Sequence, residues 1–169
     1  MTSLSRNLEA FPGMIGENAI VLNKRTAVSE ETVNEIRFGT MVAQGVAEDG
    51  ALIIATDADI LKGVVIANGP FARDYELGDF GLKPKVAFDV LTRGPIRVFA
   101  EGAMVVGNAV HVRATANAGN TVIGAFRATK DAAHTIDISH FARVVRNGDA
   151  TTPPIIELDM LFAAAAVVS

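Results

Sequence analysis

The chain contains no cysteine and no tryptophan, and its 169 residues include a single tyrosine. The absence of cysteine excludes disulfides and thiolate chemistry, and it leaves the redox compartment open. No apolar run reaches the ~20 residues that a membrane-spanning helix requires, because the longest, residues 160–168, is about half that length. Residues 1–10 have no apolar core, so we expect no signal peptide and no membrane partner.

Positive charge is scarce as well. The chain has 15 lysine and arginine residues against 19 aspartate and glutamate residues, which gives a net charge of -4 and an isoelectric point of about 5.3. The basic residues are scattered and form no run that could follow a phosphate backbone. These features argue against binding to nucleic acid or to an anionic membrane surface.

Aliphatic residues are abundant by contrast. Hydrophobic residues make up 50% of the chain and aromatic residues only 6%, with a mean hydropathy of +0.32. Much of this apolar mass is β-branched, which suits strands. A soluble monomer of this size would have difficulty burying all of it, so we infer further burial at a subunit or partner interface. A barrel with many small, alanine-lined faces is the alternative explanation.

The most regular pattern lies between residues 85 and 127, where short apolar-polar alternations are separated by glycines. The alternation predicts strands at residues 86–91, 96–99, 109–113 and 121–126. Gly94-Pro95 is predicted to form a turn between the first two, because proline fixes φ and glycine accepts a positive φ. Short strands joined by such turns predict an all-β fold, a small antiparallel β-barrel or sandwich.

Further strands are predicted on both sides of this stretch, at residues 19–22, 36–43, 51–55, 61–67, 135–138, 141–145 and 155–160. Residues 23–35 are polar and charged, and they are predicted to form a long loop or one helical turn. Residues 71–84 combine acidic residues with glycines and are predicted to form an exposed loop.

The domain organisation follows from these patterns. Residues 1–18 are predicted to form an extended N-terminal arm, because the first nine are polar and lack a period. Residues 19–169 are predicted to form a single β-barrel or sandwich domain that ends in an apolar C-terminal tail. An exposed apolar tail would promote aggregation, so we expect it to pack on a neighbouring subunit or partner, with a frayed tail as the alternative.

No motif supports a catalytic, cofactor-binding or metal-binding residue. Asp137, Ser139 and His140 are the residue types of a hydrolytic triad, but on a strand His140 points away from the other two, and no G-x-S-x-G elbow presents the serine. The histidines lack zinc-site spacing, and no acidic loop has the calcium-loop pattern. His111 lies on an alternating strand and is expected to face solvent or an interface.

One glycine-containing segment has two interpretations. Residues 104–110 form an apolar run interrupted by Gly107 and Asn108, which is a common way to turn the corner of a barrel. A ligand-facing hairpin is the functional alternative, and the structural interpretation is preferred.

Several segments occur in order along the chain: FPGM at residues 11–14, RFGTMVAQG at 37–45, KGVVI at 62–66, VLTRG at 90–94, GNAVHVR at 107–113, GAFR at 124–127, Ala142-Arg143 and the strand at 156–158. Together they resemble the capsid cement, or decoration, proteins of tailed bacteriophages. The resemblance covers residues 11–160 and rests on glycine turns and strand patterns, so it carries no catalytic residue. The family often has an acidic residue after Gly107, whereas this chain has Asn108.

The resemblance implies a structural virion protein that docks on the outside of the capsid, bridges neighbouring major capsid proteins and stabilises the expanded head. It further implies a small oligomer, a homotrimer in preference to a homodimer, that is made in the host cytoplasm and has no enzymatic activity and no cofactor. Apolar residues of the arm, the 71–84 loop and the tail are then predicted to contact another subunit or the capsid: Phe11, Met14, Phe71, Met160, Leu161 and Phe162.

Two other classes of function compete with this one. A small-molecule or glycan-binding β-barrel would need a concave pocket, and the chain has only Tyr75 and no tryptophan to stack on sugars. An enzyme on a β-scaffold would show a change of activity when His111 or His140 is substituted.

Overall fold

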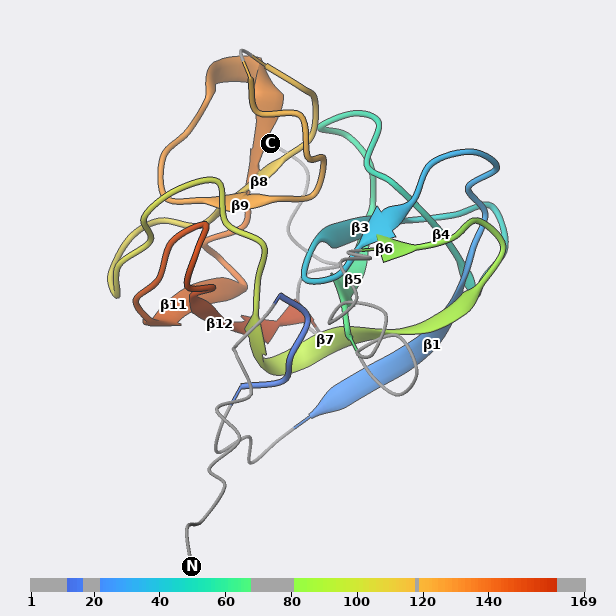
Figure 1. Cartoon of the computed structure of the whole chain (residues 1–169), viewed down its shortest axis with the longest axis horizontal. Helices are drawn as coiled ribbons and strands as arrows, with labels where there is room; N and C mark the ends of the chain where they lie inside the picture. Colours follow the sequence, from blue (N-terminus) through green and yellow to red (C-terminus); the bar gives the residue numbers. More distant parts are fainter. Residues whose placement is uncertain (1–11, 17–21, 68–80, 118, 161–169) are drawn as a thin grey trace, which may run out of the picture.

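The computed structural model describes residues 12–16, 22–67, 81–117 and 119–160 (Figure 1). Within these ranges the chain forms strands β1 to β12 and one 3₁₀ helix, η1 (Ala132–His134). The predicted all-β fold is therefore confirmed. Among the described residues, no helix is long and apolar enough to cross a membrane.

Five strands close into a barrel. They are β1 (Asn23–Ser29), β3 (Met41–Gln44), β4 (Gly50–Leu52), β5 (Leu61–Val65) and β7 (Ala87–Arg97). The strand order is β1-β4-β3-β5-β7, and the ring closes because β1 also pairs with β7. The β1–β4 pair is parallel and the other barrel pairs are antiparallel. Closure removes the free sheet edges that would otherwise pair with other chains.

A second lobe is built onto β7. Strands β12 (Ile155–Asp159) and β11 (Ala142–Arg146) extend the sheet from the second half of β7, so β11 is its outer strand. A three-stranded sheet of β10 (Thr135–Asp137), β8 (His111–Arg113) and β9 (Phe126–Arg127) lies beside them. The remaining strands, β2 (Ile36–Arg37) and β6 (Gly81–Leu82), form a small ribbon. Figure 1 shows the barrel strands and the second lobe side by side along the long axis.

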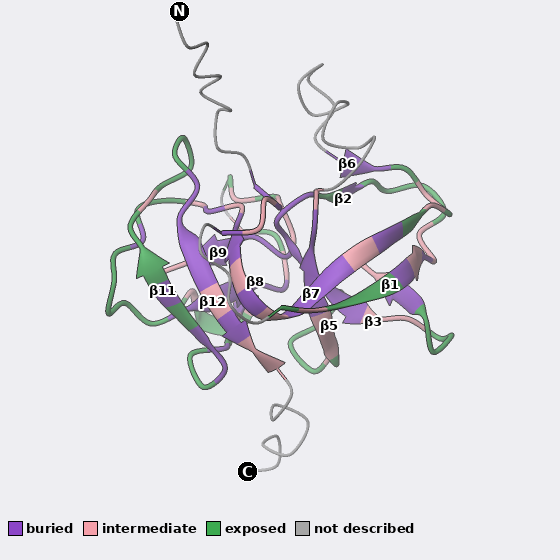
Figure 2. Ribbon diagram, turned by 90° about the horizontal axis from the view of Figure 1, so that it is seen from below, coloured by how far each residue is buried: buried purple, intermediate pink, exposed green. Residues whose placement is uncertain are grey.

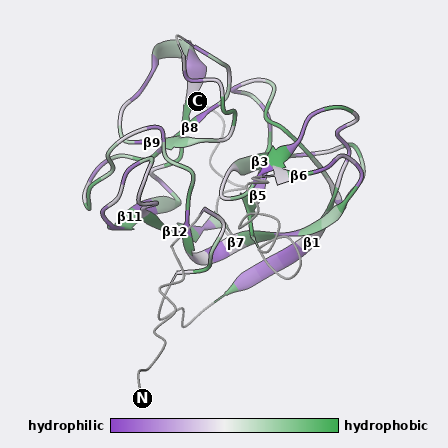
Figure 3. Cartoon of the chain, viewed as in Figure 1, coloured by the Kyte–Doolittle hydropathy of each residue, from purple (hydrophilic) through white to green (hydrophobic). Residues whose placement is uncertain are grey.

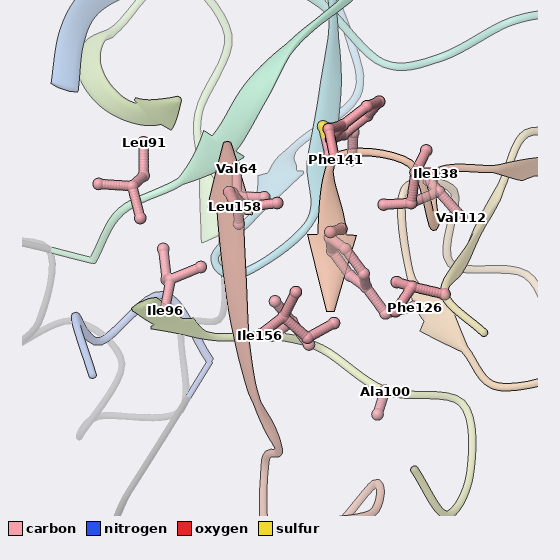
Figure 4. Close-up of a cluster of buried hydrophobic side chains, with 14 of the residues drawn as sticks. Val64, Leu91, Ile96, Ala100, Val112, Phe126, Ile138, Phe141, Ile156 and Leu158 are labelled. Atoms are coloured by element: carbon pink, nitrogen blue, oxygen red, sulfur yellow. The ribbon is translucent and has the colours of Figure 1, made fainter. Parts of the chain in front are cut away.

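The two lobes have separate hydrophobic cores that share strands. The barrel interior is filled by one or more residues from each barrel strand, together with β2, β6 and Phe38. The second core lies between the outside of the barrel and the strands of the second lobe, and it includes Leu91, Ile96, Phe126 and Ile156 (Figure 4). Strand β7 therefore contributes residues to both cores, and Figure 2 shows most of this strand buried.

This double burial explains the apolar runs in the sequence. In β7, Val90 belongs to the barrel core and Leu91 to the second core, and both are fully buried. The same division separates Val65 from Val64 in β5. Strands that are buried on both faces need apolar residues at consecutive positions rather than apolar-polar alternation.

The predicted turn at Gly94-Pro95 is wrong, because β7 runs without interruption from Ala87 to Arg97. The strand pairs with β1 and β5 in its first half and with β12 in its second half. Gly94 has a φ of 122°, a value that L side chains rarely adopt, and it stands opposite Leu158 where the strand passes between the lobes. The glycine therefore redirects a strand instead of ending it.

The prediction of a loop or helical turn at residues 23–35 is also wrong in its first half, which forms β1. The strand is hydrophilic for most of its length (Figure 3), and its residues Lys24, Arg25 and Thr26 are exposed. Only Ala27 and Ser29 are buried. Its position is set by pairing along β7 and by Asp89, which accepts hydrogen bonds from Lys24 and Thr26.

Other strands are shorter than predicted because glycines interrupt them. Gly39, with a φ of +70°, separates β2 from β3 inside the predicted strand at 36–43. Gly124, with a φ of +81°, delays the start of β9 to Phe126. In both cases a Cβ atom would lie within 3.0 Å of backbone or side-chain atoms, so a larger residue would not fit.

Residues 12–16 of the predicted arm lie against β7. The Gly13 N–H donates to the Arg97 carbonyl oxygen at 2.7 Å, and the Gly16 N–H donates to that of Pro95 at 2.8 Å. Ile15 pairs with Ile96 in an antiparallel bridge. The boundary of the arm at residue 18 remains a prediction.

The shared strand β7 predicts that the two lobes unfold together. Replacing Phe38 in the barrel core or Phe126 in the second core by alanine should each lower the free energy of unfolding by about 3–5 kcal/mol, because each removes a large buried side chain. Urea denaturation followed by circular dichroism should show a single transition in both variants. Exposed Val33→Ala serves as the control, and separate transitions for the two lobes would contradict the prediction.

Candidate functional site

The predicted contact residues fall largely outside the part of the chain that the structure describes. Phe11, Phe71, Leu161 and Phe162 lie outside it. Met14 is half-buried in the segment along β7. Met160 is half-buried at the end of β12, where it packs against the second core. The assignment of these residues to an interface therefore stays a prediction.

The structure adds large apolar side chains that sequence analysis did not single out as contacts. Described residues of this kind are exposed at Leu22, Val33, Val46, Ile60, Val105, Val106 and Val145. Val46 is 96% exposed and lies just before the Glu48-Asp49-Gly50 turn. Val105 and Val106 precede Gly107-Asn108. An apolar residue next to a strong turn signal was therefore the sequence feature that could have indicated these exposed side chains.

The Val46 loop, residues 45–49 between β3 and β4, is held in place by half-buried polar side chains. The two carboxylate oxygens of Glu30 accept the N–H groups of Val46 and Ala47, each at 2.8 Å. The Gln44 side chain donates to the Ala47 carbonyl oxygen at 2.7 Å. Lys62 donates to the Gln44 side chain at 2.9 Å. The loop is ordered before any partner binds, so binding would cost little conformational entropy.

The charge of Glu30 is part of this arrangement. Its pKa lies below the ordinary value because the backbone N–H groups of Ala47 and Val46 hydrogen-bond to the ionised carboxylate. The carboxylate is therefore ionised near neutral pH, where it fixes the loop that carries Val46.

The Val106 turn, residues 105–108, is built in a similar way in the second lobe. The Asn108 side chain accepts the Val105 N–H at 2.8 Å, and the Asn108 N–H donates to the Val105 carbonyl oxygen at 2.9 Å. The Asn147 side chain accepts the Val106 N–H at 2.8 Å. Met104, fully buried, anchors the turn to the second core. Residues 104–110 therefore contain a turn that exposes two valines, but it lies in the second lobe and not at a corner of the barrel as predicted.

Described residues line several surface grooves, among them the following three. One of about 580 Å³ lies over β7, β11 and β12 and is lined by charged groups, including Arg93 near Asp159 at 3.7 Å and Arg143 paired with Glu157. A second of about 550 Å³ is lined by polar and charged residues and Met160. The third, of about 510 Å³, lies between the barrel and the loop before β9, and polar residues, including Glu35 and Arg37, line it together with apolar ones.

Asp137, Ser139 and His140, the residues considered for a hydrolytic triad, make contacts of a structural kind. The Ser139 Oγ accepts the Val110 N–H at 3.0 Å, and the Asp137 carboxylate accepts the Ser139 N–H at 2.9 Å. This backbone hydrogen bond is the main reason why the pKa of Asp137 lies below its ordinary value. The His140 ring packs edge-to-face against Phe141. The described residues contain no group of three histidine, cysteine, aspartate or glutamate side chains placed to hold a metal ion.

A buried ion cluster ties the loops of the second lobe together. The Arg113 guanidinium has no solvent exposure, and it donates to both oxygens of Glu101, at 2.5 and 2.9 Å, and to Asp131 at 2.9 Å. Arg127 donates to Glu101 and Asp131, each at 3.1 Å. His111, on the same strand as Arg113, is only 6% exposed within a single copy, so the expectation that it faces solvent or an interface is wrong.

The cluster also shifts the ionisation of its members. The pKa of Arg113 is raised, chiefly by its hydrogen bonds to Glu101. The pKa of Asp131 lies below its ordinary value, chiefly because Arg113 and then Asn117 hydrogen-bond to its ionised form. Charge-assisted bidentate pairs of this kind hold loops in a defined geometry.

Asp131 predicts a loss of stability in acid. The folded state favours its ionised form, so the stabilisation is complete above the unfolded-state pKa of about 4 and is lost as the pH falls through the lower folded-state value. Urea denaturation between about pH 7 and pH 3 should show this fall, and Asp131→Asn should be less stable at neutral pH and less sensitive to acid. Exposed Asp57→Asn is the control. Equal acid sensitivity of Asp131→Asn and wild type would contradict the prediction.

Two comparisons identify similar proteins. Residues 2–159 match the family described as "Structural cement protein (E217 gp24/Pam3 gp6)". A chain in the solved structure "The capsid of Myoviridae Phage XM1" has a similar fold, with a TM-score of 0.62 and 11% sequence identity over 89% of this chain and 91% of that chain. At this identity the likeness supports the fold alone. No curated protein sequence matches the chain.

Proposed function

The chain belongs to the phage family of structural cement proteins, and we propose that it docks on the outside of a tailed-phage capsid, bridges neighbouring major capsid proteins and stabilises the expanded head. The match over residues 2–159, nearly the whole chain, is the observation that carries this function. A capsid-associated structural role in the virion follows from the family itself. The alternative of a small-molecule or glycan-binding module is not favoured.

The geometry suits a bridging role. The barrel and the second lobe share β7, so force applied at one end passes to the other through one continuous strand. The Val46 loop follows β3 in the barrel, whereas the Val106 turn lies beside the end of β11 (Figure 1). Two exposed apolar loops on different lobes would let one molecule touch two neighbours, and such multivalent contacts gain from avidity.

Self-association is part of the proposal, as a homotrimer in preference to a homodimer. The abundance of apolar residues supports it, because 50% of the chain is hydrophobic and large apolar side chains remain exposed on one copy. The six predicted contact residues, Phe11, Met14, Phe71, Met160, Leu161 and Phe162, are proposed to contact either another copy or the capsid. The protein would be made in the host cytoplasm and added to the outer capsid surface.

The proposed role includes no catalytic step. The Ser139 hydroxyl is occupied by the backbone of Val110, and the His140 ring packs against Phe141 instead of orienting a nucleophile. The polar groups of the second lobe form the ion cluster around Arg113, which supports loops.

Capsid binding provides the test. Purified protein added to expanded capsids that lack it should cosediment with them and raise the temperature at which they break open. Variants that lack residues 1–11 or residues 161–169 should bind about tenfold more weakly or worse, because each loses predicted contact residues.

Circular dichroism and urea denaturation of both truncated variants serve as controls for folding. Wild-type protein that neither cosediments with expanded capsids nor changes their thermal stability would refute the proposed function. Full binding by both truncated variants would refute only the assignment of contacts to the arm and the tail.

A further inference from the structure

Residues 12–16, called here the clasp, are attached to the rest of the chain through backbone hydrogen bonds. Two of their N–H groups donate to β7, and the Arg97 N–H donates back to the Met14 carbonyl oxygen at 2.8 Å. On the barrel side, the Ala67 N–H donates to the Gly13 carbonyl oxygen at 3.0 Å. The clasp therefore connects the second half of β7 with the segment that follows β5.

The clasp covers one edge of β7. Ile96 pairs with Ile156 of β12 on one side and with Ile15 of the clasp on the other. The first half of β7 has β1 as a partner, and that pairing ends at Arg93. Figure 1 shows residues 12–16 as a short blue segment separate from β1. Without the clasp, the second half of β7 would have an open edge, and open edges pair readily with other strands.

The clasp adds little to either hydrophobic core. Its buried residues are a proline and two glycines, Pro12, Gly13 and Gly16, which have small side chains or none. Ile15 is half-buried and packs against the second core from outside. The large, fully buried side chains of both cores belong to other elements. Release of the clasp would therefore break backbone hydrogen bonds but few apolar contacts, and burial of apolar area is the main source of stability.

Close packing gives the clasp a single seated position. A Cβ atom on Gly39 would lie 2.5 Å from the Cβ of Pro12. One on Gly16 would lie 2.9 Å from the Cβ of Pro95 and 3.0 Å from the Cγ2 of Ile155. The clasp has no room to slide gradually along β7, so we expect its hydrogen bonds to break together.

We propose that the clasp opens as a unit while both hydrophobic cores stay closed. Opening uncovers the edge of β7 at residues 95–97, and the backbone groups that pair with the clasp then meet water. Local openings that break few buried apolar contacts need less free energy than global unfolding. The inference goes beyond the proposed function and does not depend on it. It gives the fold a strap that can detach from β7 without loss of the barrel or of the second lobe.

Native-state hydrogen exchange of the full chain tests this opening. The clasp amides, those of Gly13, Gly16 and Arg97, should share one opening, so their protection factors should agree within about threefold. Two core amides serve as references, Val65 in the barrel and Phe126 in the second lobe, both fully buried and hydrogen-bonded. The clasp amides should be protected at least about tenfold less than the core amides. Equal protection of all five would show that the clasp opens only on global unfolding and would overturn the proposal.

Urea well below the unfolding midpoint gives an independent readout. Exchange of the clasp amides should depend weakly on urea concentration, because their opening exposes little surface, whereas exchange of the core amides should depend on it strongly. The same steep urea dependence for both sets of amides would contradict a local opening.

A glycine substitution tests the seating of the clasp. Gly16→Ala places a Cβ atom within 3.0 Å of β12 and β7 side chains, so it should lower the protection of the clasp amides by about a further tenfold and leave that of the core amides within about twofold. Gly102→Ala is the matched control, because a Cβ atom there would meet nothing within 4 Å, and it should change neither set. Equal losses of protection for clasp and core amides in Gly16→Ala would show that the clasp is an integral part of the cores and would overturn the proposal.

Discussion

The central constraint on this structure is that β7 must serve two hydrophobic cores at once. Its first half pairs with β1 and β5 inside the barrel, and its second half pairs with β12 and with residues 12–16. Neighbouring residues Val90 and Leu91 are buried in different cores, so both faces of the strand are apolar at this point. The positive φ of Gly94 lets the strand pass from one sheet partner to the next without a break.

The fold class could be predicted from the sequence, but the path of the chain through the sheets could not. Alternation and glycine turns predicted an all-β barrel, and strands such as β5, β10 and β12 lie close to their predicted positions. Gly94-Pro95 has the chemistry of a turn, and only tertiary pairing on both edges of β7 shows that it is not one. The hydrophilic β1 likewise depends on its partner strand rather than on its own pattern.

The predicted contact residues stay a prediction, and the exposed apolar loops could not be found from the sequence for physical reasons. Apolar residues in a strand-rich chain usually belong to the core, and exposure of Val46 or Val106 depends on loops ordered by Glu30 and Asn147, which lie far from them in sequence. The ion cluster was equally hidden, because Arg113 lies on an alternating strand whose polar face is covered by the loops of Glu101 and Asp131. The family resemblance, based on turns and strands, indicated the role of the protein but not its interface.

The order of strands also has a consequence for folding during synthesis. All five barrel strands lie between Asn23 and Arg97, so the barrel can close once that part of the chain has left the ribosome. The second core needs β12, which pairs with the second half of β7 some sixty residues away in sequence. Until the last strand arrives, the apolar outer face of the barrel has no cover, and this long-range pairing makes completion slow. Newly made chains therefore pass through a stage in which premature association competes with folding.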